Sequence, residues 1–183
     1  MKRNIGILLV VALLGLAVAG CGGGGSSPRS TIESVLQART KEMLNCLTAY
    51  DRVGYKSFFS TNHMASYYEQ NEATRDYIDA NDLPHDIDYQ TMMYYIDYQF
   101  DLLAAQRRLT AESGVTIQVS YQIASFKVIS STDDTALVSE KYVIITKIVS
   151  EDGQTLTQEI PVSGKTAWVK EGSTWRIVSG STL

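Results

Sequence analysis

The chain has 183 residues, of which 20 are acidic, 16 are basic and 44% are hydrophobic, so its formal net charge is −4. This balance disfavours nucleic acid as a partner, because binding to the phosphate backbone needs clusters of Lys and Arg that the sequence lacks. The two cysteines, Cys21 and Cys46, are too few for a disulfide framework or a cysteine metal site, so neither a metal nor a cofactor is expected.

The first 20 residues have the layout of a signal peptide. Lys2 and Arg3 precede an apolar run over residues 5–19, which is shorter than the ~20 residues that a transmembrane helix needs. The stretch Val18-Ala19-Gly20-Cys21 resembles the lipobox of bacterial lipoproteins. The resemblance implies cleavage before Cys21 and acylation of its thiol, and an ordinary signal peptide followed by a chance cysteine is the alternative.

A flexible tether and one domain are expected after the signal peptide. Residues 21–30 hold the lipidated Cys21 and a Gly/Ser-rich linker without side chains that could pack, and residues 31–183 are long enough for a single domain. The acyl chains would bind the lipid bilayer. In the lipoprotein resemblance, Gly22 in place of an aspartate favours the outer membrane, so the predicted location is the cell envelope, facing the periplasm.

The N-terminal half of the domain has helical periodicity. Ser30 and Glu33 have the spacing of a capping box, and apolar residues recur at helical intervals through about Asp51. Gly54 is expected to break the chain before a short helix over residues 55–59. A polar helix is expected over residues 64–80 and a long helix over residues 87–109, which begins near Asp86 or Asp88.

The C-terminal half alternates with the period of β-strands. Apolar residues alternate with polar ones from Val115 to Ile123, and the parity then slips, which indicates a β-bulge. Three further strands follow, separated by turns near residues 131–134, 152–153 and 170–173. The sequence therefore predicts an α+β domain in which N-terminal helices pack on a curved four-stranded antiparallel meander, with a cone-shaped interior.

Three features resemble the superfamily of nuclear transport factor 2 (NTF2), ketosteroid isomerase and the polyketide cyclases. They are the long first helix, the passage from Asp51 through a short helix to Phe58-Phe59-Ser60, and the closing stretch over residues 168–178. The resemblance covers roughly residues 31–183 and implies a cystatin-like cone. Members place a short strand between the second and third helices, and no such strand is predicted here.

Glu140 is the main pocket candidate. Its parity on the second strand places it on the face opposite Lys141 and Lys147, among apolar neighbours that would raise its pKa. A partner among Arg107, Arg108 and Arg176 is the structural alternative. The other pocket candidates, on the first three strands, are Tyr121, Tyr142, Gln158 and Trp168.

The catalytic residues that the resemblance implies are not found. Enzymes of the superfamily use a His–Asp pair or an Asp/Tyr pair in the cone, whereas His63 and His85 fall in predicted loops beside helix ends. The catalytic residues are therefore left unknown.

Acidic and tyrosine residues are concentrated in the middle of the chain. Residues 62–106 contain nine acids and one base, a net charge of −8, together with seven tyrosines. A surface of this kind would attract a cationic partner, and a solvated helix face is the alternative. The residues named for such a surface are Tyr67, Tyr68, Tyr94, Tyr95 and Asp97.

Three functions remain open at this point. The leading hypothesis is a non-catalytic envelope domain that binds a small apolar ligand or a basic protein surface. The first alternative is an isomerase, dehydratase or cyclase-like enzyme that uses Glu140. The second is a structural homodimer formed through the sheet, whose outward face carries Leu137, Val143 and Ile145.

Overall fold

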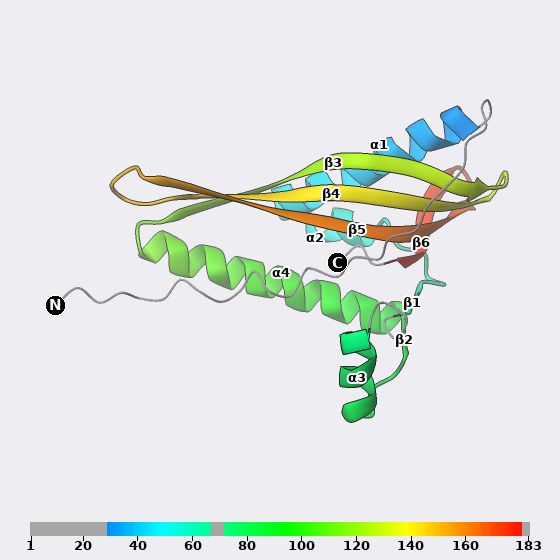
Figure 1. The fold of residues 1–183 in the computed structure, drawn as a ribbon, viewed down its shortest axis with the longest axis horizontal. Helices are drawn as coiled ribbons and strands as arrows, with labels where there is room; N and C mark the ends of the chain where they lie inside the picture. The colour runs from blue at the N-terminus through cyan, green and yellow to red at the C-terminus, as the bar shows by residue number, and fades with distance from the viewer. Residues whose placement is uncertain (1–28, 67–71, 181–183) are drawn as a thin grey trace.

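The computed structural model describes residues 29–66 and 72–180, with side chains for residues 31–66 and 75–180 (Figure 1). The predicted signal peptide, Cys21, the tether up to residue 28, Tyr67 and Tyr68 lie outside the described residues, whereas the last two residues of the predicted tether already belong to α1. The helices are α1 (Arg29–Ala49), α2 (Arg52–Lys56), α3 (Glu72–Ala80) and α4 (Tyr89–Glu112). The strands are β1 (Met64–Ser66), β2 (Asp86–Asp88), β3 (Thr116–Ser131), β4 (Thr135–Val149), β5 (Thr155–Glu171) and β6 (Thr174–Gly180).

The predicted α+β class and the antiparallel meander are confirmed. Strands β3, β4, β5 and β6 form one sheet in chain order, and each strand is antiparallel to the next. Figure 1 shows α1, α2 and α4 running beside this sheet, with the β4–β5 turn reaching past the ends of α1 and α2. The long strands therefore have one end covered by three helices and one end with less cover.

Strand β3 is bent where the sequence predicts a bulge. The register with β4 shifts between Ile123 and Ser125, as predicted, and shifts again between Val128 and Ser130. At the second shift, the backbone N–H of Val128 donates a hydrogen bond to Glu33 Oε2 at 3.1 Å. The predicted capping box is wrong, because Ser30 already lies inside α1 and Glu33 binds the sheet rather than the start of the helix.

Helix α1 ends at Ala49, near the predicted end at about Asp51, and the break before α2 falls at Tyr50 and not at Gly54. The N–H of Asp51 donates to Cys46 O at 2.8 Å and the N–H of Tyr50 donates to Leu47 O at 3.2 Å, which is a Schellman motif. Tyr50 has a φ of 58°, a left-handed conformation that costs a residue with a side chain about 1–2 kcal/mol. Gly54 lies within α2, where an added Cβ would come within 2.2 Å of the capping carboxylate of Asp51.

The middle of the chain differs from the sequence prediction. The predicted helix over residues 64–80 is replaced by β1 and the shorter α3, and β1 pairs with β2 in an antiparallel two-stranded sheet. The strand that the family resemblance implies is therefore present. Asp88 caps α4 by accepting a hydrogen bond from the N–H of Thr91 at 2.8 Å, so the helix begins after Asp88 and Ile87 belongs to β2.

The free edge of β6 is occupied by the segment after α2. Ile177 donates its N–H to Phe58 O and accepts the N–H of Ser60, both at 2.8 Å, and a parallel bridge joins Phe59 to Ile177. Ser60 also donates its hydroxyl to Glu171 Oε1 at 2.6 Å. This short segment adds main-chain hydrogen bonds to an edge that would otherwise be open.

The core lies at the covered end of the sheet. Apolar side chains of α1, α2 and α4 meet those of β3 to β6 there, and Trp168 and Val138 are almost fully buried. The other main contributors are Leu36, Met43, Tyr55, Phe59, Met92, Ile96, Phe100 and Ile177.

Candidate functional site

Glu140 is enclosed in the interior, as its strand parity predicts. It lies on β4 between Phe126 of β3 and Gly164 of β5, and its exposed fraction is 2%. Thr166 donates its hydroxyl to Glu140 Oε1 at 2.6 Å, while Oε2 has no hydrogen-bond partner among the described protein atoms. Burial raises the pKa of Glu140, and the hydrogen bond from Thr166 opposes that rise only in part.

Three tyrosines connect this carboxyl group to the end of α1. The rings of Tyr142 and Tyr121 meet edge to face with their centroids 6.5 Å apart. Burial raises the pKa of Tyr121 to about 12, and the nearby Tyr50 hydroxyl adds to that rise. Burial and the neighbouring Glu140 also raise the pKa of Tyr142. The row Glu140, Tyr142, Tyr121 and Tyr50 therefore leads from the core toward the less covered end of the sheet.

The structure does not bring the other two pocket candidates to Glu140. Gln158 is exposed and pairs with Thr146, six positions along β4 from Glu140, a separation of about 20 Å at strand spacing. Trp168 is buried in the core, with its indole N–H unpartnered among the described protein atoms.

The arginines that could have neutralised Glu140 have other contacts. Arg176 forms an ion pair with Glu171 at 2.9 Å, and Arg107 lies over the ring of Tyr50 at 4.3 Å. Within the described residues, no ion pair reaches Glu140.

The two histidines lie away from Glu140. His63 is buried, its Nδ1 lies 3.3 Å from Ile177 O, and its ring meets Phe59 edge to face. Burial lowers the pKa of His63. His85 is exposed and lies 3.6 Å from the carboxylate of Asp79.

Helix α4 has an apolar face that nothing in the described structure covers. Met92, Ile96 and Phe100 form its buried face. Because successive helical residues advance by about 100°, a second set of large side chains falls within an arc of about 100° on the opposite side. We call this set the α4 outer face; its exposed members are Tyr94, Tyr95, Tyr98, Leu102 and Leu109.

Acidic side chains surround the N-terminal half of this helix. Asp97 forms ion pairs with Lys56, at 2.5 Å, and with Arg52, so it ties α4 to α2 instead of standing free. Exposed acids on α3, β2 and the turn between them lie beside the N-terminal end of α4 (Figure 1); they are Asp76, Asp79, Asp82 and Asp86.

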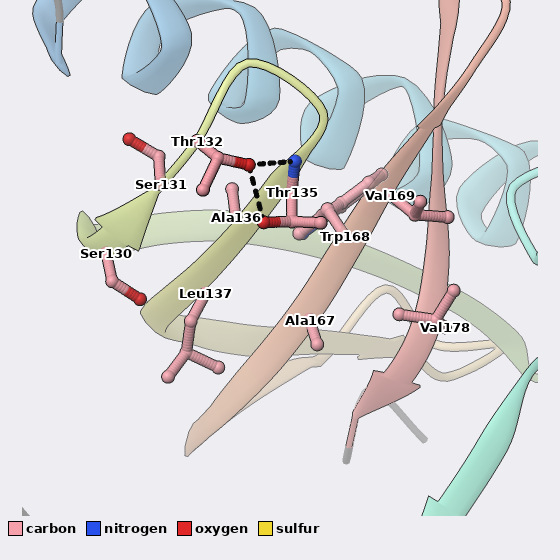
Figure 2. A pocket seen from close by; sticks show the side chains of 10 residues that line it. All are labelled: Ser130, Ser131, Thr132, Thr135, Ala136, Leu137, Ala167, Trp168, Val169 and Val178. Carbon is pink, nitrogen blue, oxygen red and sulfur yellow. Dashed lines mark hydrogen bonds between the residues drawn. The ribbon is translucent and has the colours of Figure 1, made fainter.

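Glu140 lines neither of the two surface pockets described next. The first, of about 430 Å³, lies where β3 ends and β4 begins, among residues of β3, β4, β5 and β6 (Figure 2). Its rim hydroxyls already hold the turn, because Thr132 Oγ1 accepts the N–H of Thr135 at 3.0 Å and shares a 2.8 Å hydrogen bond with the Thr135 hydroxyl.

The second pocket, of about 660 Å³, lies at the less covered end of the sheet. Its lining includes Tyr50, Arg107 and Lys147. Tyr50 and Arg107 lie on the helix-covered side of the sheet, whereas Lys147 projects from its outward face, and no sequence pattern connects the three residues. The one available signal was a bulky residue, Tyr50, at a helix end where glycine is usual.

The described residues contain no group of His, Cys, Asp and Glu side chains arranged to hold a metal ion. Within the same residues, no helix has both the length and the apolar character needed to cross a membrane.

Solved structures share this fold at low sequence identity. The CaMKII hub homology domain of Chlamydomonas reinhardtii is 19% identical with a TM-score of 0.52, covering 81% of this chain and 94% of that one. A protein described as an aromatic ring hydroxylase, from Novosphingobium aromaticivorans, is 10% identical with a TM-score of 0.52, covering 85% and 89%. An NTF2-like protein of unknown function from Pseudomonas putida is 10% identical with a TM-score of 0.49, covering 82% and 84%.

These likenesses show the fold alone, which is the NTF2-like α+β cone with an open sheet. No protein-family model matches the sequence, and no curated protein sequence matches it significantly. Because this fold carries ligand-binding, enzymatic and oligomerisation domains, function has to be argued from the sites of this chain.

Proposed function

We propose that the chain is a lipid-anchored envelope protein whose NTF2-like domain binds a cationic partner protein through the α4 outer face. The observation that carries the proposal is the second apolar face of α4. The helix has large side chains on two opposite sides, and the described structure buries only one of these sides, which leaves the other available to a partner. Exposed tyrosines are typical of the central residues of protein interfaces.

The charge around the α4 outer face selects among its possible occupants. Four exposed acids, Asp76, Asp79, Asp82 and Asp86, lie beside the N-terminal end of this face, so a second copy of the same face would be repelled there, and so would an anionic membrane surface. A basic protein surface would be attracted and would leave the tyrosine rings to supply the apolar contact.

Photo-cross-linking tests this docking. A photoreactive amino acid at Tyr94 or Tyr98 is expected to capture one protein, and the same substitution at the exposed Leu156 of β5 is expected not to. With that protein purified, Tyr94→Ala combined with Tyr98→Ala should weaken binding about tenfold or more, and added salt should weaken it further. Cross-links that form equally at Leu156, or only to lipid, would overturn the proposal.

The anchor is tested through the two cysteines. Cys21→Ser should abolish incorporation of a labelled fatty acid and release the protein from membranes. Cys46→Ser is the matched control, because Cys46 is half-buried on α1 with its Sγ 4.0 Å from Asp51, and it should leave both properties unchanged. Labelling that persists in the Cys21→Ser variant would contradict the anchor.

The enzyme alternative is less well supported by the geometry. A general base must come within hydrogen-bond reach of its substrate, whereas Glu140 is enclosed and one of its oxygens already accepts a hydrogen bond from Thr166. Binding of a small apolar ligand beside Glu140 meets the same obstacle, because side chains of the core fill the covered end of the cone.

A homodimer through the sheet remains a second proposal. Leu137, Val143 and Ile145 keep part of their surface exposed on the outward side of β4. If this face pairs two copies, Val143→Lys should convert a dimer to a monomer in light-scattering measurements, and an unchanged mass would contradict the pairing.

A further inference from the structure

We propose that the outward face of the large sheet rests on anionic lipid headgroups, a contact that orients the domain on the membrane. The contact is made by three exposed lysines, one each on β3, β4 and β5, which we call the lysine patch; they are Lys127, Lys141 and Lys165. This inference rests on the proposed lipid anchor and does not depend on the proposed docking at the α4 outer face.

The three lysines project from the same face of the sheet. Glu140 is buried on the helix-covered face, so its chain neighbours Ser139 and Lys141 project from the opposite, outward face. Lys127 of β3 and Lys165 of β5 lie directly opposite Ser139 on either side, and residues paired in this way share a face. At strand spacing, the backbones of Lys127 and Lys165 are about 10 Å apart, and Lys141 lies about 7 Å along β4 from Ser139. The three ammonium groups can therefore reach one surface laid across the sheet.

The chain does not neutralise the charge of the lysine patch. Among the described residues, no ion pair includes any of the three lysines. The residues that lie between and beside them on this face are neutral serines, Ser125, Ser139 and Ser163. Among the paired residues of β3, β4 and β5, Glu159 is the one acid on this face, and it lies opposite Ile145, about 13 Å along β4 from Lys141. A partner that supplies negative charge would therefore be attracted to the patch.

The shape of the lysine patch favours an extended surface over a single small anion. The three lysines line neither of the two pockets described above. An anionic bilayer presents many phosphate groups in one plane, and each lysine that reaches such a surface strengthens adsorption about fivefold. A second copy of the same face would instead bring lysines against lysines, which disfavours it.

The start of α1 places the proposed anchor close to the lysine patch. Cys21 lies eight residues before Arg29, where α1 begins, so the chain between them spans at most about 29 Å. Early in this helix, Glu33 accepts a hydrogen bond at 3.1 Å from the N–H of Val128, the residue after Lys127. Figure 1 shows this end of α1 at the same end of the sheet as the turn from β3 to β4. A bilayer that holds Cys21 is therefore within reach of the patch.

The proposed orientation leaves the α4 outer face free for its partner. Met92, Ile96 and Phe100 pack α4 into the core that the helix-covered face of the sheet also lines. The α4 outer face and the lysine patch thus point away from the same core in different directions. With the patch on the membrane, the acidic surroundings of α4 are turned away from anionic lipid.

Chemical labelling of the lysines in the reconstituted protein tests the contact. The lipidated chain is inserted into phosphatidylcholine vesicles with or without phosphatidylglycerol, treated with a membrane-impermeant amine reagent and analysed by mass spectrometry. Phosphatidylglycerol should lower the labelling of the lysine patch about threefold or more, and high salt should restore it. Lys41, which is exposed on α1, is the matched control and should react equally in both lipids.

Photo-cross-linking tests whether the charge of the patch holds the lipid. A photoreactive amino acid at the exposed Ser125 of β3, opposite Lys141, should capture lipid in vesicles that contain phosphatidylglycerol. Combining Lys127→Gln, Lys141→Gln and Lys165→Gln should reduce this capture about fivefold or more, whereas Lys41→Gln should leave it unchanged.

The outcomes distinguish this inference from the proposals around it. A chain that floats with neither kind of vesicle contradicts the anchor and this inference together. A chain that floats with both, but whose lysines react equally in the two lipids, contradicts this inference alone. Protection that also appears in phosphatidylcholine and grows with protein concentration would indicate a second copy, and protection confined to native membranes would indicate an acidic protein; either result overturns the inference. Tyr94→Ala should change neither the labelling nor the capture of lipid, which separates this test from that of the docking surface.

Discussion

The two ends of the long strands differ in burial although their sequences alternate in the same way. At the covered end, Val138, Glu140 and Tyr142 of β4 are buried. Farther along the same strand, Thr146 and Ile148 have the same parity and are only half-buried. The difference arises because α1 and α2 end before the strands do, as Figure 1 shows. The alternation of residues along a strand thus determines which face of the sheet each side chain occupies, and the helices packed on that face determine whether the side chain is buried.

The contrast has a chemical counterpart. The covered end encloses a single carboxyl group with a raised pKa, out of reach of solvent. At the other end Gln118, Ser120 and Lys147 are exposed, and a pocket of about 660 Å³ opens beside them. The same sheet thus encloses an acid at one end and exposes polar side chains to solvent at the other.

The largest expected effect comes from removing a core side chain at the covered end. Trp168→Ala should lower the free energy of unfolding by about 3–5 kcal/mol, because it leaves a cavity among packed side chains. Leu156→Ala, at the other end, should change it by no more than about 0.5 kcal/mol, since Leu156 is 63% exposed. Urea unfolding followed by circular dichroism measures both, and similar losses would mean that the two ends do not differ in packing.

An intermediate effect is expected from Glu140, and it depends on pH. Burial raises the pKa of Glu140 in the folded state above the ordinary glutamate value of 4.5, so as pH rises past that value the unfolded state releases its proton first. The parent should therefore lose stability between pH 4.5 and neutrality relative to Glu140→Gln, by about 1 kcal/mol or more. Urea midpoints across this range measure the effect, and parallel pH profiles for the two proteins would show that Glu140 is not enclosed.

The smallest effect is expected at the ion pairs between α2 and α4. Asp97→Asn removes the ion-pair partner of Lys56 and one of the two partners of Arg52, which keeps Asp101; these side chains are partly exposed, and water screens their attraction. The loss should be about 0.2–1 kcal/mol at low salt and should shrink as salt is added. Asp133→Asn, in an exposed turn, is the control; a loss at Asp97 that does not respond to salt would point to packing instead of charge.

The sequence was most informative where a pattern extends over many residues. Strand alternation predicted the meander, the bulge after Ile123 and the inward direction of Glu140, all of which the structure shows. The three-residue strands β1 and β2 are too short to show a period of two, so a polar helix was predicted over β1 instead. Glycine usually marks a break in a helix, so Gly54 was predicted to be one. The structure gives another reason for this glycine: a side chain here would collide with the carboxylate of Asp51, and no sequence pattern reveals that close approach.

The candidate sites were predictable only in part. Tyr94 and Tyr95 could be chosen from local composition, and both are exposed. The lining of the 660 Å³ pocket was not predictable, because Tyr50, Arg107 and Lys147 are far apart in the sequence. Gln158 was placed near Glu140 because parity gives the face of a strand but not the position along it.

The hydrogen bonds between Ile177 and the segment over residues 58–60 have a further consequence for how copies of this protein can associate. An exposed sheet edge is a template on which another chain can pair and start a growing ribbon. Here that edge is already paired with its own chain, and the opposite edge, β3, is interrupted by two shifts of register. Residues 155–165 of β5 pair with β4 but not with β6, so within the described residues this part of the margin is available to another strand, and pairing between copies would begin there and not at β6.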